Sequence, residues 1–154
     1  MTAELIDGKA IAAAMRAELK TQIDALAGRG VVPGLAVILV GDDPASASYV
    51  RAKEKACREL GMASFNHTLA PETTQAELLD VIGRCNADPR VHGILVQLPL
   101  PKHIDEHAVM PAIDPEKDVD GFHPVNIGRM VAGQPCFLPC TPHGIIQLLL
   151  RSGV

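Results

Sequence analysis

The chain has 154 residues, of which 47% are hydrophobic and 21% are charged, a composition typical of one globular domain with a substantial core. Its 14 basic and 18 acidic side chains leave a net charge of −4, so neither nucleic acid nor an anionic membrane is an expected partner. With three Phe, one Tyr and no Trp, the chain lacks the several exposed rings that a base-stacking surface needs.

Two features bear on the cellular location. The first six residues, Met-Thr-Ala-Glu-Leu-Ile, lack the charged segment and apolar stretch of a secretory signal, and the longest apolar runs are too short to span a bilayer. The four cysteines, at positions 57, 85, 136 and 140, are expected to be buried, reduced thiols. Together these features predict a cytoplasmic protein.

Helix-length and strand-length segments alternate along the first two thirds of the chain. Apolar residues recur at helical spacing over 9–27, and Gly28 is expected to end that helix. Further helices are expected over 45–60 and from 71–74 to about 85. Apolar runs predict strands at 35–40 and 91–96, each buried on both faces, and 63–69 is a further candidate strand. This alternation predicts an α/β fold with three layers, helix, sheet and helix, around a mainly parallel sheet.

The last third of the chain is less regular. A short helix is expected over 105–113, followed by an irregular segment over 114–138 that is rich in Gly, Pro and Asp. Such a long connection usually has a function of its own. The final helix, expected over 142–151, has Thr141 as its predicted N-cap and Pro142 in its first turn.

Candidate functional residues follow the predicted strands, because open α/β sheets bind ligands beyond the carboxyl ends of their strands. Tyr49 and Lys53 are four residues apart, so they share a helix face on which the lysine could do acid/base chemistry. A solvated basic face with Arg51 and Lys55 is the alternative, and spacing alone favours it. Gln97 directly follows a strand, where its amide could orient a lysine or a ligand, or cap nearby backbone.

A pair of aspartates lies in the irregular segment. Asp118 and Asp120 point to opposite sides if this piece of chain is extended, so that one could face a pocket while the other makes turn hydrogen bonds. A simple loop turn is favoured over a metal site here. The Leu98-Pro-Leu-Pro101 run is a candidate for a cis X-Pro bond.

Cys136, Cys140 and His143 form one further constellation, with the spacing Cys-x3-Cys-x2-His. Zinc sites need four ligands, and no Cys-x2-Cys pair is present. A zinc-stabilised structural domain is therefore a minor alternative, and we expect no metal.

Four segments occur in order along the chain: Val40-Gly-Asp-Asp-Pro-Ala-Ser-Ala-Ser-Tyr-Val-Arg-Ala-Lys53, Gly93-Ile-Leu-Val-Gln-Leu-Pro-Leu-Pro101, Pro115-Glu-Lys-Asp-Val-Asp-Gly-Phe122 and Pro139-Cys-Thr-Pro-His-Gly144. With these motifs in register, the chain resembles the N-terminal, folate-binding domain of the bifunctional methylenetetrahydrofolate dehydrogenase/methenyltetrahydrofolate cyclohydrolase family. The resemblance covers essentially all 154 residues. It implies a folate-binding catalytic domain over residues 1–140, with 141–154 beginning a connecting helix toward an NADP-binding domain.

The resemblance also implies roles for individual residues. Lys53 matches the catalytic lysine of the family, and Tyr49 matches the tyrosine that packs against the aminobenzoate ring of the folate. Gln97 matches the glutamine that hydrogen-bonds this lysine, and Asp120 matches the aspartate that binds the pterin. Cys140 is implied to be structural. The implied substrate-binding residues are Tyr49, Val50, Arg51, Ala52, Lys53, Val96, Gln97, Leu98, Pro99 and Asp120.

The chemistry implied by the resemblance is one-carbon transfer. Methylenetetrahydrofolate gives a hydride to NADP, and water then adds to the methenyl cation to yield 10-formyltetrahydrofolate, with Lys53 handling protons. Members of the family carry NADP on a second, Rossmann-type domain that this sequence does not resemble, so no cofactor-binding residue is expected here. We therefore expect no NADP-dependent oxidation by the chain alone.

We also expect a monomer or weak association, although the full-length family forms homodimers. A non-catalytic folate-binding module using the same pocket is the alternative.

Overall fold

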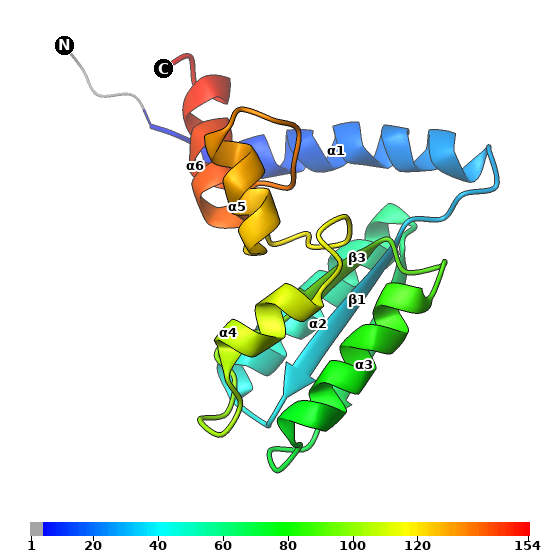
Figure 1. Ribbon diagram of the computed structural model, residues 1–154. Helices are drawn as coiled ribbons and strands as arrows, with labels where there is room; N and C mark the ends of the chain where they lie inside the picture. The colour runs from blue at the N-terminus through cyan, green and yellow to red at the C-terminus, as the bar shows by residue number, and fades with distance from the viewer. Residues whose placement is uncertain (1–4) are drawn as a thin grey trace.

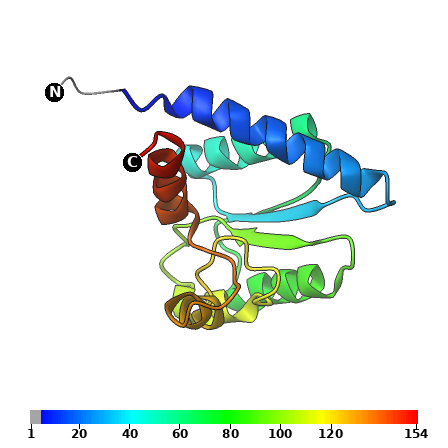
Figure 2. The same cartoon turned by 90° about the horizontal axis from the view of Figure 1, so that it is seen from above.

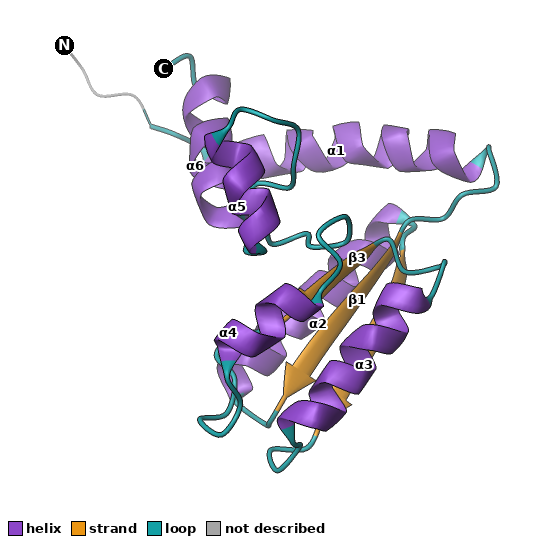
Figure 3. Ribbon diagram, viewed as in Figure 1, coloured by secondary structure: helices purple, strands orange, loops and turns teal. Residues whose placement is uncertain are grey.

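The computed structural model describes residues 5–154 and has the predicted three-layer α/β architecture (Figure 1, Figure 3). The sheet contains β1 (Gly34–Val40), β2 (Ala63–Leu69) and β3 (Gly93–Val96) in the order β2-β1-β3, with both pairs parallel. Helix α2 (Pro44–Leu60) covers one face of the sheet with α1 (Gly8–Ala27) beside it, and α3 (Gln75–Ala87) covers the other face (Figure 2). Both faces of the sheet are therefore covered by helices, and β1 and β3 are buried on both faces as predicted.

Side chains of β1 alternate between two apolar clusters, as the two-residue period of a strand requires. Ala36 and Ile38 pack with Leu78 of α3 in the larger cluster. Val37 and Leu39 pack on the opposite face, in the cluster that contains Val50 of α2. The central strand is thus covered by helices on both sides, which explains its continuous apolar sequence.

The ends of the helices follow local sequence signals. The Asp7 carboxylate accepts from the backbone N–H groups of Lys9 and Ala10 at 3.1 and 3.0 Å, which starts α1. Helix α2 ends at Gly61, whose φ of 82° is the left-handed conformation that glycine adopts most easily. A capping box of Thr74 and Glu77 starts α3.

The last third of the chain departs from the sequence prediction in three places. The segment expected to be irregular over 114–138 contains a helix, α5 (Pro124–Val131), whose buried Asn126 is hydrogen-bonded to Asp118. The helix expected over 105–113 is α4 (Glu106–Val109) followed by a 3-10 turn, η1 (Met110–Ala112), because Pro111 has no N–H to continue the α-helical ladder. Helix α6 (Cys140–Arg151) begins earlier than predicted, with Pro139 rather than Thr141 as its N-cap.

The thiol prediction is half right. All four cysteines are free, and Cys57 and Cys85 are buried, but Cys136 is half-buried and Cys140 is exposed. The predicted cis proline is confirmed at the Leu98–Pro99 bond. Among the described residues, no helix combines the length and the apolar character that crossing a membrane requires.

Candidate active site

A hollow of about 210 Å³ lies where β3 ends, and segments far apart in the sequence supply its walls. One lysine comes from α2, further residues come from the end of β3 and the loop after it, and the rest come from the 120–122 turn and the first turn of α6. The lining residues are Lys53, Leu95, Val96, Gln97, Leu98, Asp120, Phe122, Cys140, Thr141 and Pro142. The position agrees with the general rule for ligand sites in parallel sheets.

Three hydrogen bonds, one from the backbone and two at the side-chain amide, hold Gln97 in place. Its backbone N–H donates to Ile38 O at 2.8 Å, so the residue continues the β1–β3 pairing by one position. Its side-chain Nε2 donates to Leu98 O at 2.9 Å, which leaves Oε1 to accept a 3.0 Å hydrogen bond from Lys53 Nζ. The same side-chain amide thus bonds to backbone and to Lys53, so the two interpretations of Gln97 are compatible with each other.

Tyr49 lies one helical turn before Lys53, and the two side chains share a face of α2 as their spacing predicts. Lys53 Nζ is 5.7 Å from the centroid of the Tyr49 ring, within the range of a cation–π contact. The ring does not line the hollow and is 64% exposed. Arg51 and Lys55 are exposed on the same helix, whereas Lys53 is half-buried. Helix α2 therefore has a solvated basic surface next to one lysine that faces the site.

The two aspartates of the 115–122 motif have different surroundings. Asp118 is buried, and its Oδ2 accepts from the backbone N–H of His123 at 2.8 Å and from Asn126 Nδ2 at 2.9 Å. Asp120 is half-buried and lines the hollow. The chain between them forms turns rather than the extended piece that the argument from side-chain alternation assumed. One carboxylate is thus structural, and the other faces the site.

Burial raises the pKa of the Asp120 carboxyl, and the nearby charge of Asp118 adds to the rise. The ammonium of Lys53 and the thiol of Cys140 act in the opposite direction. Although the Cys140 residue is exposed, desolvation of its sulfur, and after it the charge of Asp120, raise the pKa of the thiol, whose Sγ donates to Val119 O at 3.3 Å. The thiol is therefore kept protonated and is a weak nucleophile, which fits a structural role.

The remaining residues expected at the site lie outside the lining of the hollow. Val50 is buried in the core beneath α2, while Arg51, Ala52 and Pro99 are exposed. Sequence reasoning missed five residues that do line the hollow: Leu95, Phe122, Cys140, Thr141 and Pro142. All five belong to the motifs quoted above, so the signal was present, but the sequence did not indicate which residues of each motif face the hollow.

The three residues of the Cys-x3-Cys-x2-His spacing do not gather around one hollow. Cys140 lies beside Lys53 and Asp120, whereas Cys136 lines a separate hollow with Asn126 and Arg129. Within residues 5–154, no group of three or more His, Cys, Asp or Glu side chains is arranged to hold a metal ion.

Known proteins share the sequence pattern and the fold of this chain. The family described as "Tetrahydrofolate dehydrogenase/cyclohydrolase, catalytic domain" matches residues 6–120. The chain belongs to this family. Its sequence is 58% identical over 155 aligned residues to the bifunctional protein FolD of Dehalococcoides mccartyi, an alignment that covers 100% of this chain and 52% of that protein.

Solved structures of the family have the same fold. The FolD methylenetetrahydrofolate dehydrogenase/cyclohydrolase of Campylobacter jejuni matches with a TM-score of 0.95 and 49% identity, over 97% of this chain and 54% of that one. The Trypanosoma brucei enzyme, complexed with NADP cofactor and an inhibitor, matches with a TM-score of 0.94 and 40% identity, over 100% of this chain and 54% of that one. The chain thus spans about half the length of the relatives it matches.

Proposed function

We propose that this chain forms the folate-binding half of a bifunctional methylenetetrahydrofolate dehydrogenase and methenyltetrahydrofolate cyclohydrolase. The observation that carries the proposal is the 3.0 Å hydrogen bond from Lys53 Nζ to Gln97 Oε1, in a hollow that also contains Asp120. A lysine, a neutral amide and a carboxylate around one hollow can bind a polar ring and move protons beside it. Residues 1–140 would form the catalytic domain, and 141–154 would begin the connection to the second domain.

Lys53 would handle protons when water adds to the methenyl carbon and when the ring then opens. The neutral amide of Gln97 holds the amine in place without forming an ion pair that would neutralise its charge. Asp120 would accept parallel N–H bonds from the pterin, and Tyr49 would stack on the aminobenzoate ring, since its ring is exposed beside Lys53. Val50, Arg51, Ala52, Val96, Leu98 and Pro99 complete the proposed substrate site.

The size of the hollow supports a site completed by a second domain. Pockets that enclose drug-sized ligands have volumes of roughly 300–1,000 Å³, and this one has about 210 Å³. Bound NADP would accept the hydride in the oxidation, and its binding residues would lie in the other half of the full-length relatives. We therefore predict no NADP reduction at 340 nm when this chain alone is given methylenetetrahydrofolate. The cytoplasmic location and the weak self-association expected from the sequence belong to the same proposal.

The test is the loss of methenyltetrahydrofolate absorbance in the presence of the chain, compared with buffer. We expect catalysis above buffer, and Lys53→Ala should remove general acid/base catalysis worth roughly 100-fold or more. Lys55→Ala is the matched control, because Lys55 lies two residues further along α2 and its side chain is 67% exposed. Equal rates for Lys53→Ala and the unmodified chain would overturn the catalytic role.

A non-catalytic folate-binding module is the second candidate, and the partial enclosure of the site is what favours it. Titration calorimetry with 5-formyltetrahydrofolate separates the two. Binding that is weakened by Asp120→Asn, without any rate above buffer, would indicate a binding module. Absence of both binding and turnover would contradict both candidates.

A further inference from the structure

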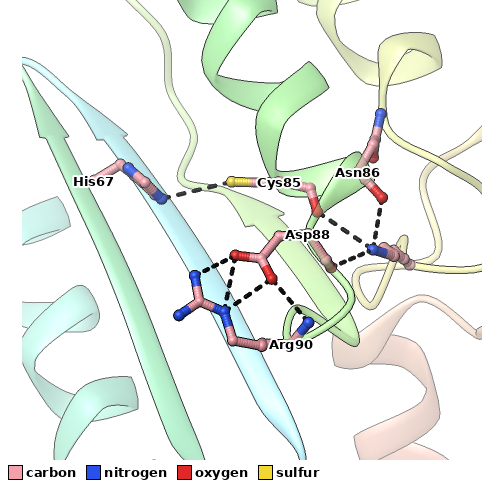
Figure 4. Close-up of polar contacts among 6 residues, drawn as sticks. His67, Cys85, Asn86, Asp88 and Arg90 are labelled. Carbon is pink, nitrogen blue, oxygen red and sulfur yellow. Dashed lines mark hydrogen bonds and ion pairs between the residues drawn. The ribbon is translucent and has the colours of Figure 1, made fainter.

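One lysine outside the hollow is held in place by backbone carbonyl groups. Lys117 Nζ donates to the carbonyl oxygens of Cys85, Asn86 and Asp88 at 3.3, 2.7 and 3.0 Å. These carbonyls lie at the carboxyl end of α3, around which Figure 4 shows Cys85, Asn86 and Asp88. The last carbonyls of a helix have no partner within the helix and form the negative end of its dipole, so an ammonium is strongly favoured there.

The carboxyl end of α3 also holds the residues that precede Lys117 in the chain, the segment 112–117. Asn86 Nδ2 donates to Ala112 O at 2.8 Å, and Asn86 Oδ1 accepts from the Asp114 backbone N–H at 3.0 Å. The Asp88 carboxylate does not compete for Lys117, because it pairs with Arg90, whose guanidinium lowers the pKa of that carboxyl to about 2 (Figure 4). Side-chain contacts with the end of α3 therefore hold the segment at Ala112, at Asp114 and at Lys117.

From Lys117 the chain runs along β3 to the hollow. Lys117 O accepts from the Ile94 backbone N–H at 2.7 Å, and Asp118 forms an isolated parallel bridge with Ile94. Val119 packs so closely on Gly93 that a Cβ added to the glycine would lie 2.5 Å from Val119 Cγ1. Asp120 is the next residue and lines the hollow, whereas Lys117 does not. Two residues, both in contact with β3, therefore connect Lys117 to Asp120.

We infer that Lys117 is a positioning residue, whose ammonium on the end of α3 sets the place of Asp120 in the hollow. Lys117 acts through Asp120 and does not touch the ligand. The inference deepens the proposed function and rests on it for the role of Asp120 in folate binding. The placement of the carboxylate itself can be measured without any ligand.

The first experiment follows the carboxyl carbon of Asp120 by NMR through a pH titration of the full 154-residue chain. Lys117→Met keeps the length of the side chain and removes the ammonium. We expect the pKa of Asp120, which burial now raises, to move toward its ordinary value as the turn loosens and the carboxylate becomes more exposed to water. An unchanged titration of Asp120 in a folded Lys117→Met chain would overturn the inference.

The second experiment is a double-mutant cycle on the affinity for 5-formyltetrahydrofolate. Lys117→Met should weaken binding about tenfold, a loss of about 1.4 kcal/mol, because the displaced Asp120 carboxylate meets the ligand less well. Because the effect passes through Asp120, adding Lys117→Met to Asp120→Asn should cost no further affinity. Fully additive losses, or unchanged binding by Lys117→Met, would contradict the inference.

Val81→Ala is the stability control for both experiments. Val81 is buried on α3, so its truncation lowers the melting temperature without removing any contact of Lys117. We expect this variant to keep both the Asp120 titration and the ligand affinity. If Asp120→Asn alone leaves binding unchanged, the proposed function fails, while the NMR titration still decides the role of Lys117.

Discussion

At the scale of single residues, the hollow combines a lysine and a carboxylate that are not directly bonded to each other. The structure gives Lys53 a hydrogen bond to Gln97, and gives Asp120 the opposing influences of burial and of the lysine charge. Burial prevails, so the charged form of Asp120 is disfavoured by folding. Ionisable groups whose charged form is disfavoured by folding are typical of functional sites, and they lower the stability of the free protein.

Asp120→Asn should therefore make the free chain more stable at neutral pH while weakening folate binding. A carboxyl whose pKa is raised by folding opposes folding where it is ionised, above the folded-state pKa, and this cost disappears once pH falls below the ordinary value of 3.8. In urea unfolding at pH 7, the variant should have a higher midpoint than the parent. The difference between the two midpoints should shrink as pH falls toward 3.8. A variant less stable than the parent at pH 7 would contradict this interpretation.

Asp118→Asn is the matched control and should have the opposite effect. Asp118 is buried and its Oδ2 accepts two hydrogen bonds, from His123 N and Asn126 Nδ2. Loss of charge-assisted hydrogen bonds in a buried position costs roughly 1–3 kcal/mol. The same urea experiment should thus separate the carboxylate that faces the site from the one that supports it.

Gly121→Ala should lower the free energy of unfolding by roughly 2 kcal/mol or more, because backbone strain and a steric clash act together at this position. Gly121 has a φ of +68°, and a Cβ there would lie 2.6 Å from the carbonyl carbon of Leu138. Gly133→Ala is the control, since Gly133 has a φ of +67° and a Cβ added there would meet no atom within 4 Å. Equal losses for the two variants would mean that close packing against Leu138 contributes nothing.

At the scale of elements, side chains define both ends of α3. The capping box of Thr74 and Glu77 satisfies N–H groups at its start, and Lys117 satisfies carbonyl groups at its end. The helix packs against the sheet through Leu78, Val81 and Ile82. An element fixed in this way is a rigid support for the neighbouring turn that carries Asp120.

Thr74→Ala should lower the unfolding free energy by about 1 kcal/mol, the usual value of an N-cap. The Thr74 N–H and hydroxyl groups lower the pKa of Glu77. The stability that the ionised Glu77 carboxylate contributes through these bonds is therefore present at neutral pH and is lost as pH falls through the lowered pKa. The difference between parent and variant should therefore narrow in acid. Thr21→Ala is the control, because Thr21 is exposed inside α1 and its hydroxyl donates to Ala17 O of the same helix, and this variant should change stability little.

At the scale of the whole molecule, α1 and α6 are peripheral to the three-layer core. Ile23 is the one buried residue of α1, and α6 has none. The two helices are joined by Arg151, which donates two 2.8 Å hydrogen bonds to the Glu18 carboxylate. Exposed ion pairs of this kind stabilise weakly and are screened by salt.

Hydrogen exchange should therefore show weaker protection in α1 and α6 than in β1, because local opening exposes little buried surface in these helices. Arg151→Ala, or added salt, should accelerate exchange in α6 further and leave β1 unchanged. Protection of α6 equal to that of β1 would show that this helix unfolds only together with the core.

The sequence by itself determined the features that depend on neighbouring residues. The helical spacing over 9–27, the continuous apolar run at 35–40 and the helix expected over 45–60 each depend only on local geometry, so α1, β1 and α2 were predicted within a few residues. The spacing of Tyr49 and Lys53 likewise placed them on one face of a helix. The quoted motifs also indicated the family, which the comparisons confirm.

Only the tertiary structure decided the features that depend on packing between distant segments. Helix α5 docks through Asn126 on Asp118, the first turn of α6 brings Cys140 to the hollow, and Lys117 reaches across about 30 residues of sequence to the end of α3. None of these contacts leaves a local period or a capping signal, because each depends on how the elements pack together. The physical reason is that a residue's neighbours along the chain determine its backbone conformation, whereas the fold as a whole determines what its side chain contacts.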